Sequence, residues 1–369
     1  MRCVVTGVAG FIGSHLAERL ITAGHEVVGI EAFTDYYSRP LKEANLQVLR
    51  DYHHDRFTLI EADLAHMAPE ALAAALDGAE WIYHQAAQAG VRTSWGESFA
   101  IYTACNITAT QRLLEAARHI STLKRLVYAS SSSVYGDAPT LPVTEQSPTA
   151  PVSPYGVTKL AGEHLCRLYW RNFGVPTVAL RYFTVYGPRQ RPDMAFHQFG
   201  RALLTGTPLV VYGDAAQTRD CTHVSDVVAA NLLAAQAPAD AGEGVDGEVF
   251  NIAGGGRVGL RGVIAQMEEL LGRRAVIEHR ASAQGDVRDT YGDITRAQRV
   301  LGYAPTMRLH EGLASELAYL ETLYSPPVPA LMPGLASSSA AATPAVPAAA
   351  HTDMSPQPSR PGRRPPGSG

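Results

Sequence analysis

The glycine-rich segment near the start of the chain constrains the fold more than any other feature. The sequence TGVAGFIGSHL places Gly7, Gly10 and Gly13 between a short β-branched run and an amphipathic segment. Without a Cβ atom, Gly7 permits a sharp turn, Gly10 lets the backbone approach a diphosphate, and Gly13 lets the next helix pack close to the strand. A helix that begins here directs free N–H groups at an anion. The segment therefore predicts a phosphate-binding turn between a strand and a helix, with a purely structural turn as the alternative.

Runs of β-branched residues alternate with helical patterns over roughly the first half of the chain. Strands are expected at 4–5, 26–30, 57–60, 81–83, 126–128 and 178–180. The helices expected between them include 11–23, 100–118 and 155–173. This alternation predicts an α/β protein built on a Rossmann-type doubly wound parallel sheet. Further candidate helices predict a smaller C-terminal α/β lobe, at 196–204, 224–236, 260–271 and 310–323.

The composition excludes several classes of function. The 369 residues are 46% hydrophobic, which is enough to bury a large core. The net charge of -4 comes without long runs of one sign, so neither nucleic acid nor a membrane is an expected partner. Cys3, Cys105, Cys166 and Cys221 are too scattered for a disulfide framework or a zinc site, and no metal is expected. Since no apolar stretch is long enough to span a bilayer and the first strand begins almost at once, we expect a soluble, cytoplasmic protein.

Two acidic residues at the ends of predicted strands indicate the kind of dinucleotide. Glu31 follows Gly13 by eighteen positions, where a carboxylate can accept hydrogen bonds from the adenosine ribose and would repel a 2'-phosphate. NAD is therefore favoured over NADP, with a solvated loop acid as the alternative for Glu31. Asp63 ends the third predicted strand and is a candidate for contact with adenine.

A serine run and a Tyr-x-x-x-Lys pair form the candidate catalytic group. Serines occupy positions 130–133 at the end of a predicted strand, while Tyr155 and Lys159 are four residues apart and share one helix face. A free tyrosine ionises near pH ~10, so a nearby ammonium and a cationic nicotinamide are needed to make the phenolate accessible near neutrality. Tyr155 is the expected general base, and Ser131 is expected to position the hydroxyl that loses its proton.

Four segments carry a family resemblance: GVAGFIG, SSSSVYG, SPYGVTK and RYFTVYGPRQRPDMA. They closely resemble the extended short-chain dehydrogenase/reductases of the NAD-dependent epimerase/dehydratase family, specifically the UDP-glucuronate 4-epimerases, from Met1 to about Tyr324. The resemblance implies the catalytic residues Ser131, Tyr155 and Lys159. It also implies that NAD is contacted by Gly7, Gly10, Phe11, Ile12, Gly13, Glu31, Asp63, Leu64, Ala86, Ala87, Gln88, Asn106, Tyr155, Lys159 and Tyr182.

The resemblance implies a reaction without net redox change, which converts UDP-glucuronate to UDP-galacturonate at C4. Tyr155 would remove the proton of the sugar 4-hydroxyl as the C4 hydride passes to NAD, and the 4-keto sugar would rotate before the hydride returns. Related dehydratases and decarboxylases carry acidic residues beside the catalytic hydroxyl. Here those positions are Ser132 and Ser133, so a reaction confined to C4 is expected.

Hydroxyl and cationic side chains are the expected substrate contacts. By the resemblance, Ser132, Ser133 and Thr184 hold the sugar carboxylate, and enzymes for neutral hexoses commonly have asparagine in place of Thr184. The diphosphate is expected to meet Arg191, Arg219 and Arg288, with Arg92 near the substrate and Tyr212 against the uracil. The chain departs from the family pattern at Glu31-Ala32, where Asp-Asn is usual, and at Arg288, where proline is usual.

Two other functions stay open at this point. An epimerase for UDP-glucose and UDP-galactose, or one with dual specificity, would share the same catalytic residues and differ only in the pocket. A regulator that senses NAD without catalysis would reuse the fold, although the complete Ser131, Tyr155 and Lys159 set argues against it.

The resemblance also implies a domain organisation. Residues 1–182 are expected to bind NAD, with 222–253 returning to that domain, and residues 183–221 and 254–324 are expected to bind the nucleotide sugar. The segment 325–369, rich in Pro, Ala and Ser, is expected to be a disordered tail. A homodimer is expected through helices 100–118 and 155–173.

Overall fold

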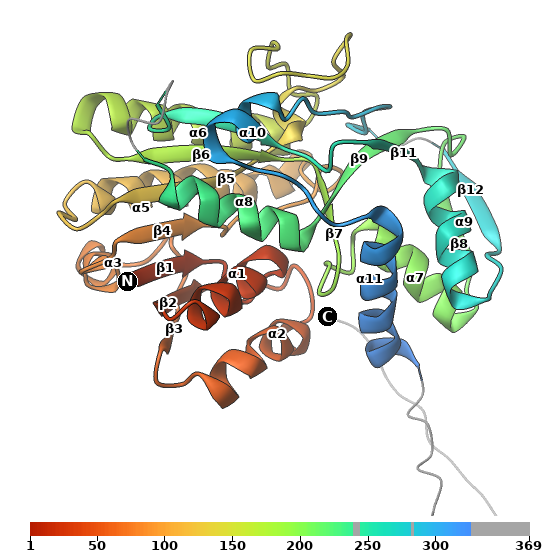
Figure 1. Cartoon of the computed structure of the whole chain (residues 1–369), viewed down its shortest axis with the longest axis horizontal. Coiled ribbons are helices and arrows are strands. Elements are labelled where there is room, and N and C mark those ends of the chain that lie inside the picture. The colour runs from red at the N-terminus through yellow and green to blue at the C-terminus, as the bar shows by residue number, and fades with distance from the viewer. Residues whose placement is uncertain (239–243, 282–283, 326–369) are drawn as a thin grey trace, which may run out of the picture. The chain divides into compact units, whose positions relative to one another are not determined.

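A seven-stranded sheet lies at the centre of the computed structural model, which describes residues 1–238, 244–281 and 284–325 (Figure 1). The strand order is β10-β6-β5-β4-β1-β2-β3, and every neighbouring pair is parallel. In chain order the strands are β1 (Arg2–Thr6), β2 (Glu26–Glu31), β3 (Phe57–Glu61), β4 (Trp81–His84), β5 (Arg125–Ser131), β6 (Thr177–Tyr182) and β10 (Glu248–Ile252). The predicted Rossmann-type doubly wound sheet is confirmed, and its order reverses between β1 and β4, where such sheets bind ligands.

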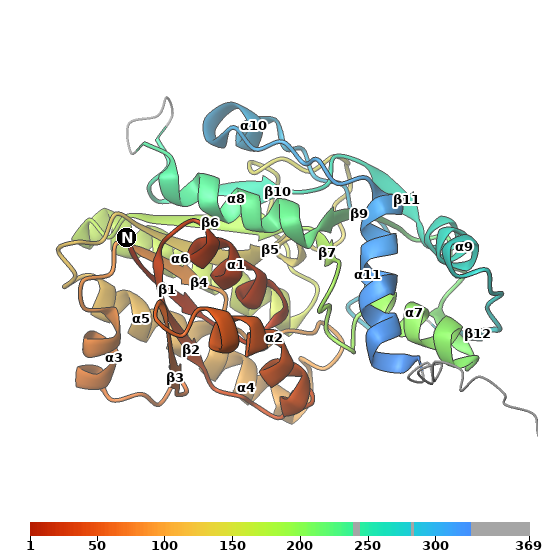
Figure 2. The same ribbon diagram turned by 60° about the horizontal axis from the view of Figure 1, so that its bottom comes forward.

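Helices cover both faces of this sheet (Figures 1 and 2). They are α1 (Phe11–Thr22), α2 (Arg39–Tyr52), α3 (Pro69–Leu76), α4 (Phe99–Thr103), α5 (Ala109–Ala117), α6 (Pro154–Phe173), α8 (Val224–Gln236) and α10 (Thr295–Leu301). Because strand side chains alternate in direction, Cys3 and Val5 join the core beneath α1 and α8, whereas Val4 joins the core beneath α3, α5 and α6. Both cores are apolar, as expected of a parallel sheet.

The helix expected at 100–118 is not regular. A π-helical segment, η2 (Ala104–Thr108), separates α4 from α5. Within it, the Asn106 side chain hydrogen-bonds the backbone of Gln88 and the hydroxyl of Thr158. Such an insertion re-aims one side chain without ending the helix, and hydrophobic periodicity carries no sign of it.

The chain beyond β6 forms a smaller α/β lobe, as predicted. One sheet contains β7 (Thr184–Tyr186), β9 (Thr218–His223) and β11 (Arg257–Gly259), and β8 (Leu209–Tyr212) pairs with β12 (Ile277–Arg280). The remaining helices are α7 (Ala195–Thr205), α9 (Leu260–Leu271) and α11 (Leu309–Tyr324). They pack around a third apolar core that includes Phe199, Met267 and Leu317.

Residues 1–325 form one compact unit by their contacts. Within it, α8 and β10 leave the smaller lobe and pack against the large sheet, with β10 beside β6. Apart from Ser325, the expected tail at 325–369 lies outside the described residues. No helix among the described residues is long and apolar enough to cross a membrane.

A buried carboxyl group links α11 to the loop after β7. Glu316 is fully buried, its Oε2 accepts a hydrogen bond from the Gly187 N–H at 3.0 Å, and its Oε1 has no partner among the described residues. Burial raises the pKa of Glu316 to about 8, and the hydrogen bond from Gly187 opposes this only in part. The folded protein therefore holds this carboxyl group protonated at neutral pH.

This protonation makes stability depend on pH. The unfolded chain releases the proton near the ordinary value of 4.5, so between that pH and about 8 the folded state binds more protons and the free energy of unfolding falls as the pH rises. The Glu316→Gln variant keeps an acceptor for the Gly187 N–H but cannot ionise. We expect its free energy of unfolding to fall less than that of the wild type as the pH rises from about 5 to about 9. Thermal melts of both proteins from about pH 5 to about pH 9 should separate by roughly 3 °C or more at the alkaline end. Parallel melting curves over the whole range would contradict the assignment.

Candidate active site

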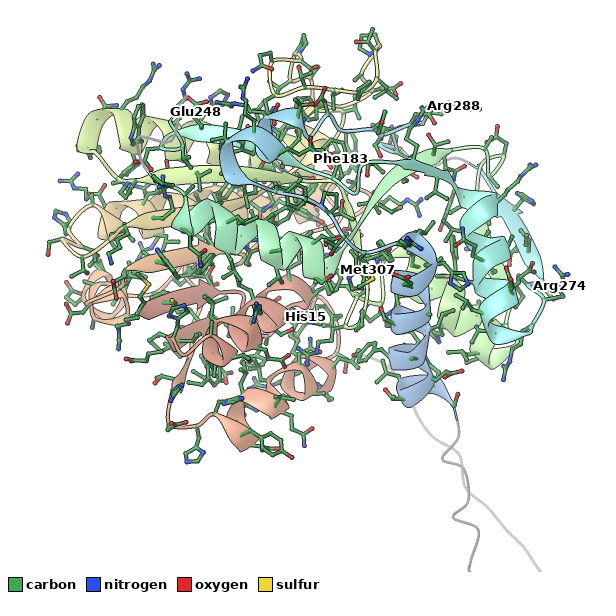
Figure 3. All side chains as sticks on the ribbon, viewed as in Figure 1. His15, Phe183, Glu248, Arg274, Arg288 and Met307 are labelled. Atoms are coloured by element: carbon green, nitrogen blue, oxygen red, sulfur yellow. The ribbon has the colours of Figure 1, made fainter. Side chains whose placement is uncertain are left out.

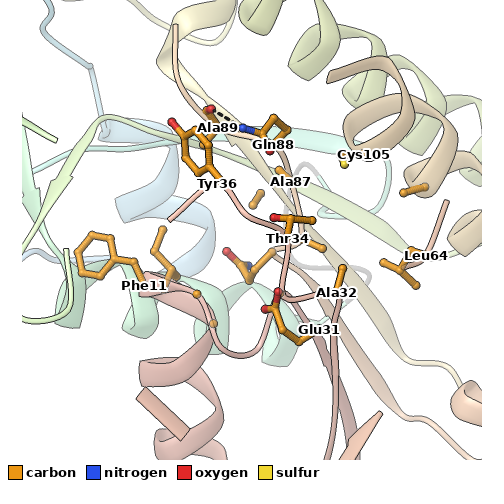
Figure 4. Close-up of a pocket in the computed structure, with 18 of the residues that line it drawn as sticks. Phe11, Glu31, Ala32, Thr34, Tyr36, Leu64, Ala87, Gln88, Ala89 and Cys105 are labelled. Atoms are coloured by element: carbon orange, nitrogen blue, oxygen red, sulfur yellow. Dashed lines mark hydrogen bonds between the residues drawn. The ribbon is translucent and has the colours of Figure 1, made fainter. Parts of the chain in front are cut away.

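A cavity of about 200 Å³ opens along the carboxyl ends of β1, β2, β4 and β5 (Figure 4). Every residue expected to contact NAD, except Asn106, lines it. These lining residues are Gly7, Gly10, Phe11, Ile12, Gly13, Glu31, Asp63, Leu64, Ala86, Ala87, Gln88, Tyr155, Lys159 and Tyr182. Asn106 lies behind the lining, where its hydrogen bonds hold Gln88.

The glycine-rich turn at one end of the cavity tolerates no side chains at two positions. A Cβ on Gly7, whose φ is +67°, would lie 2.8 Å from the backbone of Ala86, and a Cβ on Gly13 would lie 2.2 Å from the Gly7 carbonyl oxygen. This close packing brings the N-terminus of α1 and its free N–H groups to the cavity, which fits a bound diphosphate. The residues present thus suit the dinucleotide predicted from the sequence.

The two acids expected near the adenosine both line the cavity and both bind backbone. Glu31 accepts hydrogen bonds from Ala9 N–H at 3.1 Å and from Phe33 N–H at 3.0 Å, one on each carboxylate oxygen. Asp63 accepts from Ala65 N–H at 2.9 Å. Each carboxylate oxygen has a second lone pair, so these bonds leave both side chains able to accept a hydroxyl or an amine.

Helix α6 carries Tyr155 and Lys159 in its first turns. The helix begins at a cap in which Ser153 Oγ accepts from Gly156 N–H at 3.1 Å, and Pro154 occupies its first turn. Ser131, at the end of β5, hydrogen-bonds the hydroxyl of half-buried Tyr155. The expected catalytic residues therefore lie together beside the cavity, on α6 and at the end of β5.

Burial governs the acidity of the two titratable groups. It raises the pKa of Tyr155, and the charge of Arg191 and then the hydrogen bond with Ser131 oppose that rise. It lowers the pKa of Lys159 to about 7. Lys159 Nζ donates to the Ala129 carbonyl at 2.8 Å and lies 6.0 Å from the centre of the Tyr155 ring. Burial thus makes Lys159 easier to deprotonate than an exposed lysine.

Arg191 is separated from the other arginines expected to bind substrate. It lines the cavity and pairs with Asp193, from Nε to Oδ1 at 3.0 Å and from Nη2 to Oδ2 at 3.1 Å. Its charge acts on both Tyr155 and Lys159. The structure therefore brings Arg191 to the reacting end of the cavity.

The remaining cationic and aromatic candidates gather where the smaller lobe meets the loop after β4, which carries Arg92. Arg92 pairs with Asp286 at 2.6 Å, and its guanidinium carbon lies 3.9 Å from the centre of the Tyr212 ring. Arg219 donates to the carbonyl oxygens of Val287 and Arg288 at 2.8 and 2.9 Å. Arg288 is exposed and points outward near β9 and β11 (Figure 3). These four residues come from segments far apart in the sequence and form one cluster.

The three hydroxyl residues expected near a sugar carboxylate are half-buried. Ser133 N–H donates to Ser131 Oγ at 3.2 Å, and Ser131 Oγ donates to Ser133 Oγ at 3.1 Å. Ser132 begins the short turn η3 (Ser132–Val134), and Thr184 begins β7 opposite Cys221. None of the three lines the cavity described above.

The sequence analysis missed the loop between β2 and α2. Thr34, Tyr36 and Tyr37 of this loop and Lys42 of α2 line the cavity, and Lys42 Nζ donates to the Thr34 carbonyl at 2.6 Å. Figure 4 labels Thr34 and Tyr36 at the cavity. The available signal was a pair of adjacent tyrosines five and six residues after Glu31, the acid that ends the second strand. Among the described residues, no group of three or more His, Cys, Asp or Glu side chains is placed to hold a metal ion.

Comparison with known proteins adds a family match. The model of the NAD dependent epimerase/dehydratase family matches residues 3–253. Uncharacterized UDP-glucose epimerase YtcB of Bacillus subtilis (strain 168) is 44% identical over 325 residues, covering 88% of this chain and 99% of that protein. UDP-glucuronate 4-epimerase of Thermodesulfobacterium geofontis (strain OPF15) is 34% identical, covering 84% and 93%.

A solved structure agrees with this match. The crystal structure of UDP-glucuronic acid 4-epimerase from Bacillus cereus, in complex with UDP-glucuronic acid and NAD, has a TM-score of 0.83 and 42% sequence identity. The similarity covers 88% of this chain and 100% of that one. It extends over both the large sheet and the smaller lobe.

The tight turn at Gly13 yields a test of cofactor binding. We expect Gly13→Ala to weaken NAD binding at least about tenfold, because the added methyl group forces the turn and α1 apart. Gly259→Ala is the matched control, since a Cβ there meets nothing within 4 Å. Isothermal titration with NAD measures both variants, and unchanged affinity in Gly13→Ala would show that the turn does not hold the diphosphate.

Proposed function

The chain belongs to the NAD dependent epimerase/dehydratase family, and on that premise we propose that it interconverts UDP-glucuronate and UDP-galacturonate by inverting C4. The observation that carries the proposal is the placement of Ser131, Tyr155 and Lys159 beside a cavity suited to NAD. The names of the relatives and of the solved structure support the same reaction. The enzyme is thus an isomerase.

Tyr155 is the proposed general base for the sugar 4-hydroxyl. Its hydrogen bond with Ser131 and the charge of Arg191 both favour the ionised phenol. Bound NAD supplies the hydride acceptor and donor at C4. Lys159, held on the same helix face, is the proposed contact to the cofactor ribose. On the return half of the reaction Tyr155 gives its proton back, so the enzyme ends unchanged.

The proposed cofactor residues divide by task. The turn at Gly7, Gly10 and Gly13 holds the diphosphate, and Glu31 and Asp63 face the adenosine. The remaining proposed contacts to NAD are Phe11, Ile12, Leu64, Ala86, Ala87, Gln88, Asn106 and Tyr182. Since Asn106 lies behind the cavity lining, its contribution is to hold Gln88 in place.

The smaller lobe is the proposed site of the nucleotide sugar. Arg219 and Arg288 are the proposed grip on the diphosphate, and Arg92 and Tyr212 lie near them for the uridine. Arg191 remains a proposed substrate contact at the sugar end. Ser132, Ser133 and Thr184 are proposed to fix the carboxylate, so that the bond to carbon dioxide is not aligned with the transient ketone.

The domain assignment follows the same division. We propose that residues 1–182 with 222–253 bind NAD and that 183–221 with 254–324 bind the nucleotide sugar. The parallel pairing of β10 with β6 supports the return of 222–253 to the cofactor domain.

Assembly and location are further parts of the proposal. We infer a homodimer through α4, α5 and α6, because Ile101, Val157, Leu168 and Phe173 expose large apolar side chains on α4 and α6. We also propose a cytoplasmic protein, which agrees with its four unpaired cysteines.

Epimerisation of UDP-glucose is the second candidate. Its specific support is the relative from Bacillus subtilis whose name is that of a UDP-glucose epimerase. The two reactions share every catalytic group and differ at the C6 substituent, so the hydroxyl cluster decides between them. A regulator that senses NAD without catalysis has no such support.

Product analysis tests the reaction directly. We expect the purified protein to convert UDP-glucuronate to its C4 epimer without net NADH or carbon dioxide, and Tyr155→Phe to lower the rate at least about a hundredfold while retaining NAD. Chromatography of incubations with UDP-glucuronate and with UDP-glucose measures both. Turnover of UDP-glucose alone would transfer the assignment to the second candidate.

Thr184 gives a test of substrate choice. We expect Thr184→Asn to lower kcat/KM for UDP-glucuronate relative to UDP-glucose by about tenfold, because a hydroxyl contact to the carboxylate is lost. Thr205→Asn, at the exposed end of α7, is the control for the same substitution away from the site. An unchanged ratio of the two kcat/KM values would remove Thr184 from the carboxylate site.

A further inference from the structure

A tyrosine in the loop between β2 and α2 reaches across the cavity to the loop after β7. Tyr36 Oη donates a hydrogen bond to Asp193 Oδ2 at 3.0 Å, which joins residues 157 positions apart. Figure 4 shows Tyr36 on the side of the cavity that carries Gln88 and Ala89. The site therefore contains a link that the catalytic residues alone do not explain.

The place of Tyr36 is built into the surrounding backbone. Gly90 adopts φ +105°, and a Cβ there would lie 2.5 Å from the Tyr36 hydroxyl oxygen. Lys42 fixes the path of the same loop by donating to the Thr34 carbonyl at 2.6 Å. The tyrosine thus occupies a defined position at the cavity wall.

Asp193 is shared between Tyr36 and Arg191. The Arg191 guanidinium donates from Nε to Oδ1 at 3.0 Å and from Nη2 to Oδ2 at 3.1 Å. Its carbon lies 5.7 Å from the centre of the Tyr36 ring. A two-point bond of this kind fixes the plane of the guanidinium as well as its distance. Asp193 thus links the Tyr36 hydroxyl to the Arg191 guanidinium through one carboxylate.

The held guanidinium acts on the proposed base. Arg191 and Tyr155 line the same cavity, and the charge of Arg191 is the largest influence that opposes the effect of burial on the pKa of Tyr155. Ser131 acts in the same direction through its hydrogen bond, and Tyr102, whose ring centre is 6.3 Å from that of Tyr155, acts against it. Lys159 Nζ, 6.0 Å from the Tyr155 ring, donates to the Ala129 carbonyl.

Resting on the proposed function, we propose that Tyr36 and Asp193 are positioning residues that hold the Arg191 guanidinium toward the Tyr155 phenol, where its charge favours loss of the proton. Tyr36 has a specific part in this. Its hydroxyl donates to Oδ2, an oxygen that also faces Arg191, and so offsets negative charge that would cancel the guanidinium. Tyr36 links proton removal at Tyr155 to the loop that follows Glu31 at the adenosine end.

The test compares Tyr36→Phe with Tyr83→Phe in the full-length protein with NAD bound. Tyr83 of β4 is the matched control, because its buried hydroxyl has no hydrogen-bond partner among the described residues and it packs in the core beneath α1 rather than in the cavity lining. We expect the pH profile of kcat with UDP-glucuronate to move to higher pH in Tyr36→Phe. Its rate should be about threefold to tenfold below the wild type near neutrality and should converge with it at alkaline pH. The profile of Tyr83→Phe should coincide with that of the wild type.

A second readout separates this proposal from the proposed function. The ultraviolet absorbance of tyrosinate, taken as the difference between each protein and its Tyr155→Phe counterpart, follows ionisation of Tyr155 without any substrate. We expect that ionisation to occur at higher pH in Tyr36→Phe. If the wild type does not convert UDP-glucuronate but this shift is present, the proposed substrate fails and the positioning role stands.

Two results would overturn the positioning role. One is a Tyr36→Phe titration that coincides with the wild-type curve. The other is a kcat that falls by the same factor at every pH, since a purely structural defect has that signature. Equal melting temperatures of the two phenylalanine variants establish that both are folded.

Discussion

The close approach of the β1–α1 turn to the end of β4 is the constraint on which the site depends. Gly7 packs against the backbone of Ala86, and Gly13 packs against the carbonyl of Gly7, so the turn has no room to relax. Beneath it, buried His84 bridges the hydroxyls of Thr6 and Thr110 at 2.8 and 2.9 Å. Burial lowers the pKa of His84 to about 3, so this bridge is uncharged across the physiological range. One rigid junction thereby fixes the anion-binding helix end and the cavity floor.

A buried ion pair between Glu163 and Arg181 fixes the position of β5 relative to α6. Glu163, one turn after Lys159 on α6, accepts a hydrogen bond from Ser130 Oγ. It also accepts two hydrogen bonds from the Arg181 guanidinium of β6, at 2.9 and 2.7 Å. Replacing such a pair with apolar residues can be neutral for stability, but removing one partner leaves a buried charge. We therefore expect the pair to matter for position rather than for stability. It fixes the end of β5, and with it Ser131, relative to the helix that carries Tyr155.

Sequence reasoning recovered the parts of this protein that depend on local pattern. The parallel sheet, the lobe and the main helices follow from periodicity and glycine placement, and the cavity is lined by nearly all the residues expected there. The π-helical segment at Ala104–Thr108 was missed because the bonds that accompany it join Asn106 to Gln88, in the loop after β4, and leave no trace in the local pattern. The separation of Arg191 from Arg219 was also missed. Arg191 pairs with Asp193 two residues further on, whereas Arg219 donates to the backbone of Val287, far away in the chain. The position of Arg219 and the π-helical segment both depend on contacts between segments far apart in the chain.

The charged groups around the cavity differ in burial from those near Arg92 and Arg288. Around the cofactor cavity the polar groups are buried and bonded to backbone, as for Glu31 and Lys159, so they are organised before anything binds. At the smaller lobe, Arg92 of the loop after β4 and Arg288 form ion pairs that stay partly exposed to water. Exposed pairs contribute little and exchange readily, so a diphosphate can displace the carboxylates from these arginines at small cost. This difference agrees with the proposed function, in which the cofactor is retained and the nucleotide sugar exchanges at every turnover.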